Sequence, residues 1–109
     1  MANYSDILIT TDYDRTLTAP DATIPTKNLE AIRHFIENGG AFTVNTGRTV
    51  PSAANLMESV PVNAPFLLYN GSAAYDKQND TFLFAHEIQL NWMETYHKIR
   101  DRYPSLWLE

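Results

Sequence analysis

The sequence predicts an α/β protein whose core is a partial, Rossmann-like, parallel three-layer (αβα) arrangement, followed by a β-hairpin and a further helix. Two observations support this fold class. Short β-branched runs alternate with segments of helical periodicity, which indicates parallel strands joined by crossover helices. Polar residues also follow the predicted strands directly, at the edge where such sheets bind ligands.

The first strand–helix unit occupies residues 7–40. Residues 7–11, Ile-Leu-Ile-Thr-Thr, predict a strand buried on both faces. Residues 18–25 are polar with two prolines and predict a loop, after which Thr26 is expected to cap a helix over residues 27–38. Gly39-Gly40 is a typical helix end. The apolar face of this helix is predicted from its spacing to be Leu29, Ile32, Phe35 and Ile36.

The second and third strands follow the same pattern. Residues 41–45 predict a strand, residues 46–49 a loop, and Pro51 the first turn of a helix that runs to about Ser59 with Leu56 and Met57 inward. Residues 66–69 predict the third strand, which stops at Asn70-Gly71.

The rest of the chain predicts a hairpin and a last helix. Residues 73–75 and 81–84 form the hairpin strands around a polar loop at 76–80. A helix is expected over about residues 91–102, and Pro104 stops it. One side of this helix is predicted to carry Met93, Tyr96, Ile99 and Tyr103.

Composition excludes several function classes. The chain has 109 residues, a net charge of −5 and no basic stripe, so nucleic acid is not expected as a partner. The absence of cysteine excludes disulfides, thiolate metal sites and a cysteine nucleophile. Neither a signal peptide nor an apolar run long enough to cross a membrane is visible, so we expect a cytoplasmic protein without a membrane partner.

The strongest chemical signal is Asp12-Tyr13-Asp14, directly after the first strand. Two carboxylates at this spacing repel each other unless a cation or proton lies between them, and Mg²⁺ prefers such oxygen ligands. A carboxylate can attack phosphorus to form an aspartyl-phosphate, and a second one can exchange protons with the leaving group and water. Asp is also common in turns after strands, so the spacing alone leaves a structural role open.

Two weaker signals follow the next strands. Thr46-Gly47-Arg48 offers a hydroxyl donor and a close backbone approach for an anion, although such a tripeptide is often only a turn. Asn70-Gly71 is a common tight-turn dipeptide and carries little information by itself.

Taken together, these motifs resemble the haloacid dehalogenase-like superfamily, with the Cof-like, sugar-phosphate-phosphatase-like branch (subfamily IIB) as the nearest likeness. The family has D-x-D-x-T-L after an apolar strand, and this chain has it from Asp12 to Leu17. The branch then has strands ending in T-G-R and in Asn-Gly. These correspond to Thr46-Gly47-Arg48 and Asn70-Gly71, so the resemblance covers nearly the whole chain.

The resemblance implies a role for each matching residue. Asp12 is the expected nucleophile and Asp14 the general acid/base, and both are expected Mg²⁺ ligands. Thr46 and Gly47 are expected to bind the phosphoryl group. The remaining motif residues are expected to line the pocket, namely Thr16, Arg48, Asn70 and Gly71. The implied substrate is a small phosphorylated metabolite, with sugar phosphates as the favoured class.

The chain also departs from the family pattern. Arg15 stands where the family usually has Gly. The family's later Lys and acidic metal ligands have no counterpart, so we expect residues 1–88 to be the N-terminal half of the core with its hairpin. Residues 89–109 are then the start of a truncated cap domain. Alone, the chain is expected to have little phosphatase activity. The unpaired edge of residues 7–11 is expected to favour a homodimer or swapped assembly.

Other functions remain open at this point. A phosphomutase of the same superfamily would share Asp12 and Asp14. A non-catalytic module that binds phosphate or Mg²⁺ belongs to a different class. A receiver-like phosphoacceptor domain is disfavoured, because its acceptor Asp ends the third strand, where this chain has Tyr69-Asn70.

Overall fold

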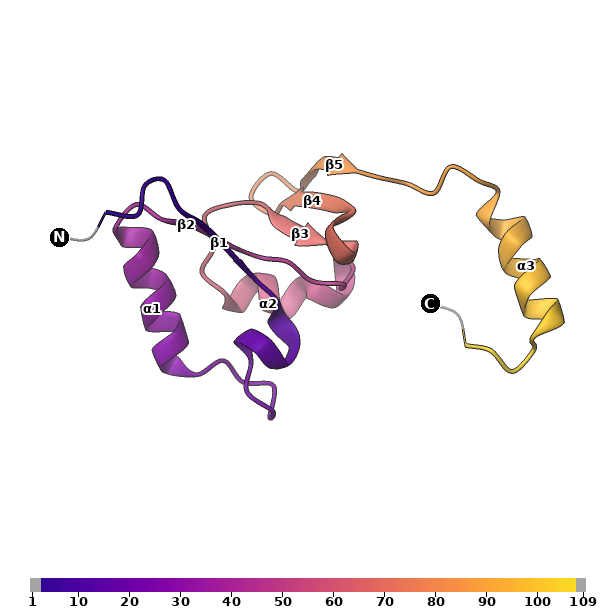
Figure 1. Cartoon of the computed structure of the whole chain (residues 1–109), viewed down its shortest axis with the longest axis horizontal. Coiled ribbons are helices and arrows are strands. Elements are labelled where there is room, and N and C mark those ends of the chain that lie inside the picture. The colour runs from indigo at the N-terminus through magenta and orange to yellow at the C-terminus, as the bar shows by residue number, and fades with distance from the viewer. Residues whose placement is uncertain (1–2, 108–109) are drawn as a thin grey trace.

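The computed structural model describes residues 3–107, which form a sheet with helices on one side and a separate C-terminal helix (Figure 1). Residues 1–2 of the predicted core unit (1–88) and residues 108–109 of the predicted cap segment (89–109) lie outside the described residues. β1 (Leu8–Thr11) pairs in parallel with β2 (Ala41–Val44), in a register that sets Leu8 beside Ala41. The predicted α/β class is therefore confirmed.

A single parallel bridge, Asn45 to Leu67, links β2 to β3 (Phe66–Leu68). β4 (Ala73–Asp76) and β5 (Thr81–Ala85) continue from β3 as antiparallel strands, with a bulge at Ala74/Tyr75. The predicted hairpin is thus confirmed. The third strand is shorter than predicted, because Tyr69 already belongs to a tight turn over Tyr69–Gly71.

The core lies between the strands and the helices α1 (Thr26–Glu37) and α2 (Ala54–Ser59), which occupy the same side of the sheet in Figure 1. Alternate residues of β2 and β3 face this side. The largest fully buried side chains are Val44, Leu56, Phe66 and Leu68. Burying such side chains stabilises the fold by about 1.5–3 kcal/mol each before the entropy cost of ordering them.

Both helices differ slightly at their starts from the predictions. Thr26 is the first residue of α1 and not its cap. Pro25 precedes the helix with a φ of −56°, and its carbonyl accepts from the N–H of Asn28 at 2.9 Å. The second helix begins with a 3-10 turn over Pro51–Ala53 before α2. The predicted inward residues Leu56 and Met57 are buried.

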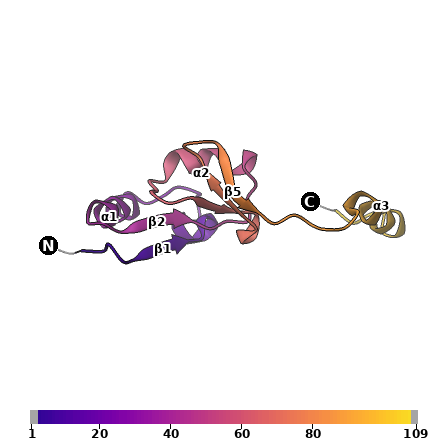
Figure 2. The ribbon, with the colours of Figure 1, turned by 90° about the horizontal axis from the view of Figure 1, so that it is seen from above.

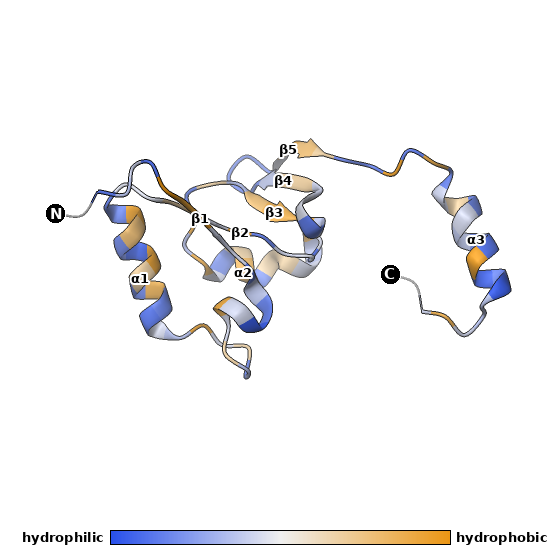
Figure 3. Ribbon diagram, viewed as in Figure 1, coloured by the Kyte–Doolittle hydropathy of each residue, from blue (hydrophilic) through white to orange (hydrophobic). Residues whose placement is uncertain are grey.

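The prediction that residues 7–11 are buried on both faces is wrong. Leu8 is 60% exposed and Ile9 41% exposed. β1 pairs with β2 on one side only, and among residues 3–107 no strand lies along its other edge. Figure 2 shows β1 at the margin of the sheet, and the hydropathy colours of Figure 3 mark hydrophobic residues along it. The predicted unpaired, apolar edge is therefore present.

α3 (Trp92–Arg102) stands away from the sheet at the end of an extended segment (Figure 1). Asn91 caps it, since its Oδ1 accepts from the N–H of Glu94 at 3.2 Å. No residue of α3 is buried, so the predicted apolar side of this helix faces solvent. No helix within the described range 3–107 has the length and apolarity to cross a membrane.

The open edge of β1 predicts self-association, and Leu8→Lys should reduce it. A lysine at an exposed edge strand disfavours pairing with a second sheet. Light scattering with size-exclusion chromatography should show an assembly for the unaltered chain and more monomer for Leu8→Lys. Ala31→Lys adds the same charge at an exposed position of α1 and serves as the control. A monomeric unaltered chain at high concentration would contradict the expectation.

Candidate functional site

The carboxyl ends of β1, β2 and β3 meet at a pocket of about 300 Å³. The parallel register sets Thr11 beside Val44, so the residues that follow these strands emerge at the same edge of the sheet. Four predicted site residues line this pocket: Asp12, Thr46, Gly47 and Asn70. The fold thus brings together residues from three separate motifs.

Thr46 is the most firmly held residue of the pocket and is only 4% exposed. Its N–H donates to the carbonyl of Leu67 at 2.9 Å, and its carbonyl accepts from the N–H of Asn70 at 3.1 Å. Its Oγ1 accepts from the N–H of Arg48 at 3.2 Å. Among the described residues nothing accepts the hydroxyl hydrogen, so Thr46 can donate it to an anion in the pocket.

Gly47 allows a close approach of the Asn70 side chain. A Cβ at this position would lie 2.8 Å from Oδ1 of Asn70, which is nearer than real Cβ contacts come. The glycine therefore lets the Asn70 side chain lie over the loop that follows β2.

Asp12 is exposed and is oriented by its neighbour in the first motif. Its Oδ2 accepts from the hydroxyl of Thr16 at 2.8 Å. Within residues 3–107, Oδ1 of Asp12 accepts no hydrogen bond. Thr16 thus holds the carboxylate by one oxygen and leaves the other for a ligand but, contrary to the prediction, Thr16 does not itself line the pocket.

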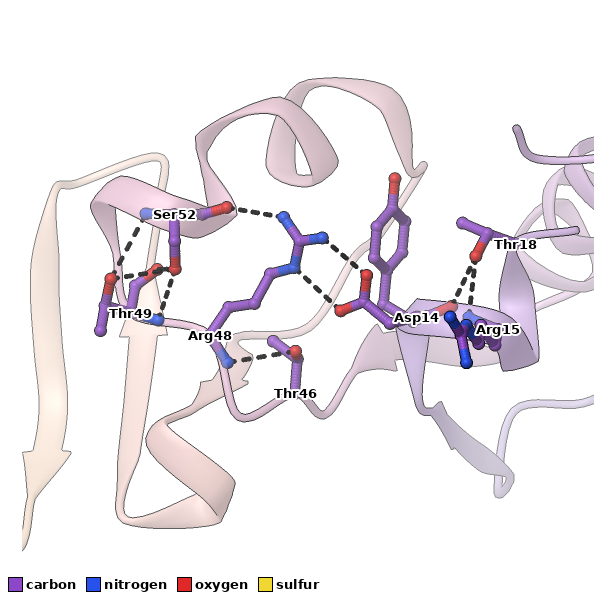
Figure 4. A network of polar contacts seen from close by, with 8 residues as sticks. Asp14, Arg15, Thr18, Thr46, Arg48, Thr49 and Ser52 are labelled. Atoms are coloured by element: carbon purple, nitrogen blue, oxygen red, sulfur yellow. Dashed lines mark hydrogen bonds and ion pairs between the residues drawn. The ribbon is translucent and has the colours of Figure 1, made fainter. Parts of the chain in front are cut away.

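The Asp14 carboxylate binds Arg48 and does not line the pocket. Nε of Arg48 donates to Oδ2 of Asp14 at 2.9 Å, and Nη2 donates to Oδ1 at 2.6 Å (Figure 4). Nη1 donates to the carbonyl of Ser52 at 2.9 Å, and the guanidinium carbon lies 5.4 Å from the centre of the Tyr13 ring. The charge of Asp14 is thus neutralised by an arginine, where the sequence predicted a cation shared with Asp12.

This ion pair changes the acidity of Asp14. The hydrogen bonds from Arg48, with a smaller contribution from its charge, hold the pKa of Asp14 below the ordinary value of 3.8. Reciprocally, the hydrogen bond to Asp14 raises the pKa of Arg48. Asp14 is therefore fully ionised near neutral pH in this arrangement.

Arg15 and Gly71 both have left-handed backbone conformations. Arg15 has a φ of +60°, a backbone conformation that Gly adopts more readily than Arg. Its N–H donates to the hydroxyl of Thr18 at 2.9 Å. Gly71 has a φ of +86° and forms part of the turn after β3, but it does not line the pocket.

Sequence reasoning missed three further residues of the lining: Thr10, Thr11 and Asn45. They immediately precede the motif residues, and their place at the strand ends was the available signal. A larger hollow of about 590 Å³ lies between residues 60–66 and the turn of the hairpin, and it contains no predicted site residue.

The pocket offers carboxylate, hydroxyl and carboxamide oxygens, which suit a hard cation such as Mg²⁺ better than a soft one. Asp12 is its only carboxylate. Over residues 3–107, no three His, Cys, Asp or Glu side chains gather into a metal centre. These residues therefore fit part of a magnesium site.

Comparison with known proteins gives consistent matches. The sequence model of the haloacid dehalogenase-like hydrolases matches residues 9–106. A Bacillus subtilis (strain 168) protein, 5-amino-6-(5-phospho-D-ribitylamino)uracil phosphatase YcsE, is 30% identical over 89 residues. That match covers 78% of this chain and 36% of the relative, so the chain spans about a third of the relative's length.

Solved structures share the fold. BT1666 of Bacteroides thetaiotaomicron, from a study of phosphatases of the haloalkanoate (HAD) superfamily, matches 90% of this chain and 36% of its own. Its TM-score is 0.76 and its identity 14%. The subclass IIB sugar phosphatase BT4131 matches 88% of this chain and 37% of its own, with a TM-score of 0.68 and 16% identity.

Arg48→Gln is predicted to raise the pKa of Asp14 toward its ordinary value, because the bidentate hydrogen bonds and the positive charge are lost. Because folding lowers the pKa of Asp14, its ionised carboxylate stabilises the fold at pH values above the pKa that it has in the unfolded chain. That contribution is lost as pH falls through the folded pKa. A carboxyl ¹³C NMR titration measures the change, with Arg33→Gln at an exposed position of α1 as the control. If the pKa of Asp14 is the same in Arg48→Gln as in the unaltered chain, the ion pair does not form in solution.

Substitutions at Arg15 should separate backbone strain from side-chain effects. Arg15→Gly should change the free energy of unfolding by less than about 1 kcal/mol, because relief of the left-handed conformation is offset by a more flexible unfolded chain. Arg15→Val should destabilise by roughly 1–2 kcal/mol, because β-branched residues rarely adopt this conformation. Urea denaturation checks both values. Equal stability of the two variants would argue against a left-handed residue 15.

Proposed function

This chain belongs to the haloacid dehalogenase-like hydrolase family, and on that premise we propose that it forms part of a phosphatase with Asp12 as nucleophile. The observation that supports this most directly is the pocket itself. Asp12 and Thr46 line the same small space, and within residues 3–107 Oδ1 of Asp12 accepts no hydrogen bond and the hydroxyl hydrogen of Thr46 has no acceptor. The Asp12 carboxylate can attack phosphorus while the Thr46 hydroxyl donates to a phosphoryl oxygen.

The proposed reaction has two steps. An Asp12 oxygen bonds to phosphorus, the bond from phosphorus to the ester oxygen breaks, and the leaving alcohol takes a proton from Asp14. Water then attacks the aspartyl-phosphate, Asp14 accepts a proton from it, and inorganic phosphate leaves with Asp12 restored. Asp14 can carry that proton only when it is released from Arg48, so opening of this ion pair is part of the proposal.

Magnesium would be held by Asp12 and Asp14, with Asp14 contributing through its backbone carbonyl. When bound, it would supply positive charge against the phosphoryl oxygens. The residues that line the pocket supply neither a lysine nor a second carboxylate, so we expect hydrolysis by this chain alone to be slow.

A small phosphate ester of a sugar or polyol is the proposed substrate class. The similarity to a ribitylaminouracil phosphatase and to a sugar phosphatase supports it. The neutral polar residues Asn45, Thr10 and Asn70 around the pocket are compatible with a hydroxylated leaving group. A phosphomutase would use the same two aspartates.

A second candidate is a module that binds phosphate and Mg²⁺ without catalysis. The observation that favours it is the bidentate Arg48–Asp14 pair, which withholds the proposed general acid from the pocket. In that function Asp12 would never become phosphorylated.

Phosphorylation of Asp12 separates the two functions. Incubation with Mg²⁺ and a small phosphodonor such as acetyl phosphate should give one phosphoryl adduct, stable enough to detect by intact-mass spectrometry because hydrolysis is slow. Hydroxylamine should release it, and Asp12→Asn should abolish it. Asp6→Asn, at the other end of β1, is the matched control. Magnesium-dependent phosphate binding without any adduct would support the binding module instead.

A further inference from the structure

The turn that follows β3 has an unusual backbone. Tyr69, Asn70 and Gly71 have φ values of +53°, +56° and +86°. Asn and Gly tolerate this left-handed region, but for a bulky Tyr it is rare and costs energy. Such a conformation persists where surrounding contacts hold it, and these places cluster at functional sites.

Contacts with the loop after β2 hold this turn in place. The N–H of Tyr69 donates to the carbonyl of Arg48 at 3.1 Å, and the N–H of Asn70 donates to the carbonyl of Thr46 at 3.1 Å. The hydroxyl of Tyr69 accepts from the N–H of Val50 at 3.4 Å. These hydrogen bonds hold the turn against the loop that carries Thr46 and Gly47, the candidate phosphate-binding residues.

The consequence is that the backbone of Asn70 is held beside the pocket, with its carboxamide over Gly47. The carboxamide lies so close over Gly47 that a Cβ there would meet its Oδ1 at 2.8 Å, and it lines the pocket beside Asp12 and Thr46. Within residues 3–107 the carboxamide makes no hydrogen bond, so its N–H groups remain available. The guanidinium of Arg48, by contrast, is paired with Asp14 and can reach a phosphoryl group only after that pair opens.

We propose that Asn70 is a phosphoryl-binding residue, which the left-handed turn Tyr69–Gly71 positions so that its Nδ2 donates to a phosphoryl oxygen. This inference rests on the proposed function of the pocket. A neutral donor suits the position because phosphoryl oxygens only accept hydrogen bonds, while a further carboxylate would repel them. Thr46 donates from the buried base of the pocket, and Asn70 donates from its exposed rim.

The test is a ¹⁵N NMR titration of the full chain with inorganic phosphate in the presence of Mg²⁺. Phosphate should shift the side-chain amide of Asn70 together with the backbone amides of Thr46 and Gly47. Asn70→Gly keeps the left-handed turn and removes the carboxamide, so it should weaken phosphate binding by roughly tenfold or more. Asn70→Asp should weaken it further, because it adds a negative charge. Asn55→Asp on exposed α2 should leave phosphate affinity unchanged.

A double-mutant cycle tests the position of the side chain. Gly47→Ala should displace the Asn70 carboxamide and weaken phosphate binding, and it should have little further effect in Asn70→Gly, which lacks the group that the new Cβ meets. Phosphate affinity equal to that of the unaltered chain in Asn70→Gly, or no phosphate-dependent shift of the Asn70 amide, would overturn the inference. Neither result depends on whether Asp12 becomes phosphorylated, so failure here is distinguishable from failure of the proposed phosphatase.

Discussion

The backbone of Asn45 and Thr46 ties the ends of the parallel strands to one another. The N–H of Asn45 donates to Thr11 on one side, and the N–H of Thr46 donates to Leu67 on the other, both within 2.9 Å. Asn70 completes the link by donating to the Thr46 carbonyl. Because these bonds continue the pairing beyond the strands themselves, Asp12, Thr46 and Asn70 emerge at one edge. The chemistry proposed for the pocket depends on this backbone arrangement more than on any side-chain contact.

The Arg48–Asp14 pair sets the electrostatics beside this pocket. Its side chains are 37% and 54% exposed, and partly exposed ion pairs contribute only about 0–1 kcal/mol. A phosphoryl dianion can therefore compete for the guanidinium at little cost. The pair would then keep Asp14 ionised between turnovers and release it when a ligand arrives, which reconciles the observed geometry with a general acid role.

Much of this arrangement could be predicted from sequence periodicity and the rule that ligands bind at strand ends. The motif residues Asp12, Thr46, Gly47 and Asn70 were expected at one edge of the sheet on that basis, and the family resemblance implied a shared pocket. The Arg48–Asp14 pair could not be foreseen, because its partners are 34 residues apart and their meeting depends on how two loops fold over the sheet. The exposure of Leu8 also escaped prediction, because an apolar run indicates a strand but does not reveal whether anything packs against it. The left-handed Tyr69 contradicts its residue type and is held only by tertiary contacts.

The roles of Asp12 and Thr46 can be tested with a crystal structure of the chain grown with Mg²⁺ and beryllium fluoride, a mimic of a phosphorylated aspartate. We expect beryllium bonded to a carboxylate oxygen of Asp12, with one fluorine within hydrogen-bond distance of Oγ1 of Thr46. Beryllium fluoride bound to Asp14, or bound to Asp12 but directed away from Thr46, would contradict these roles.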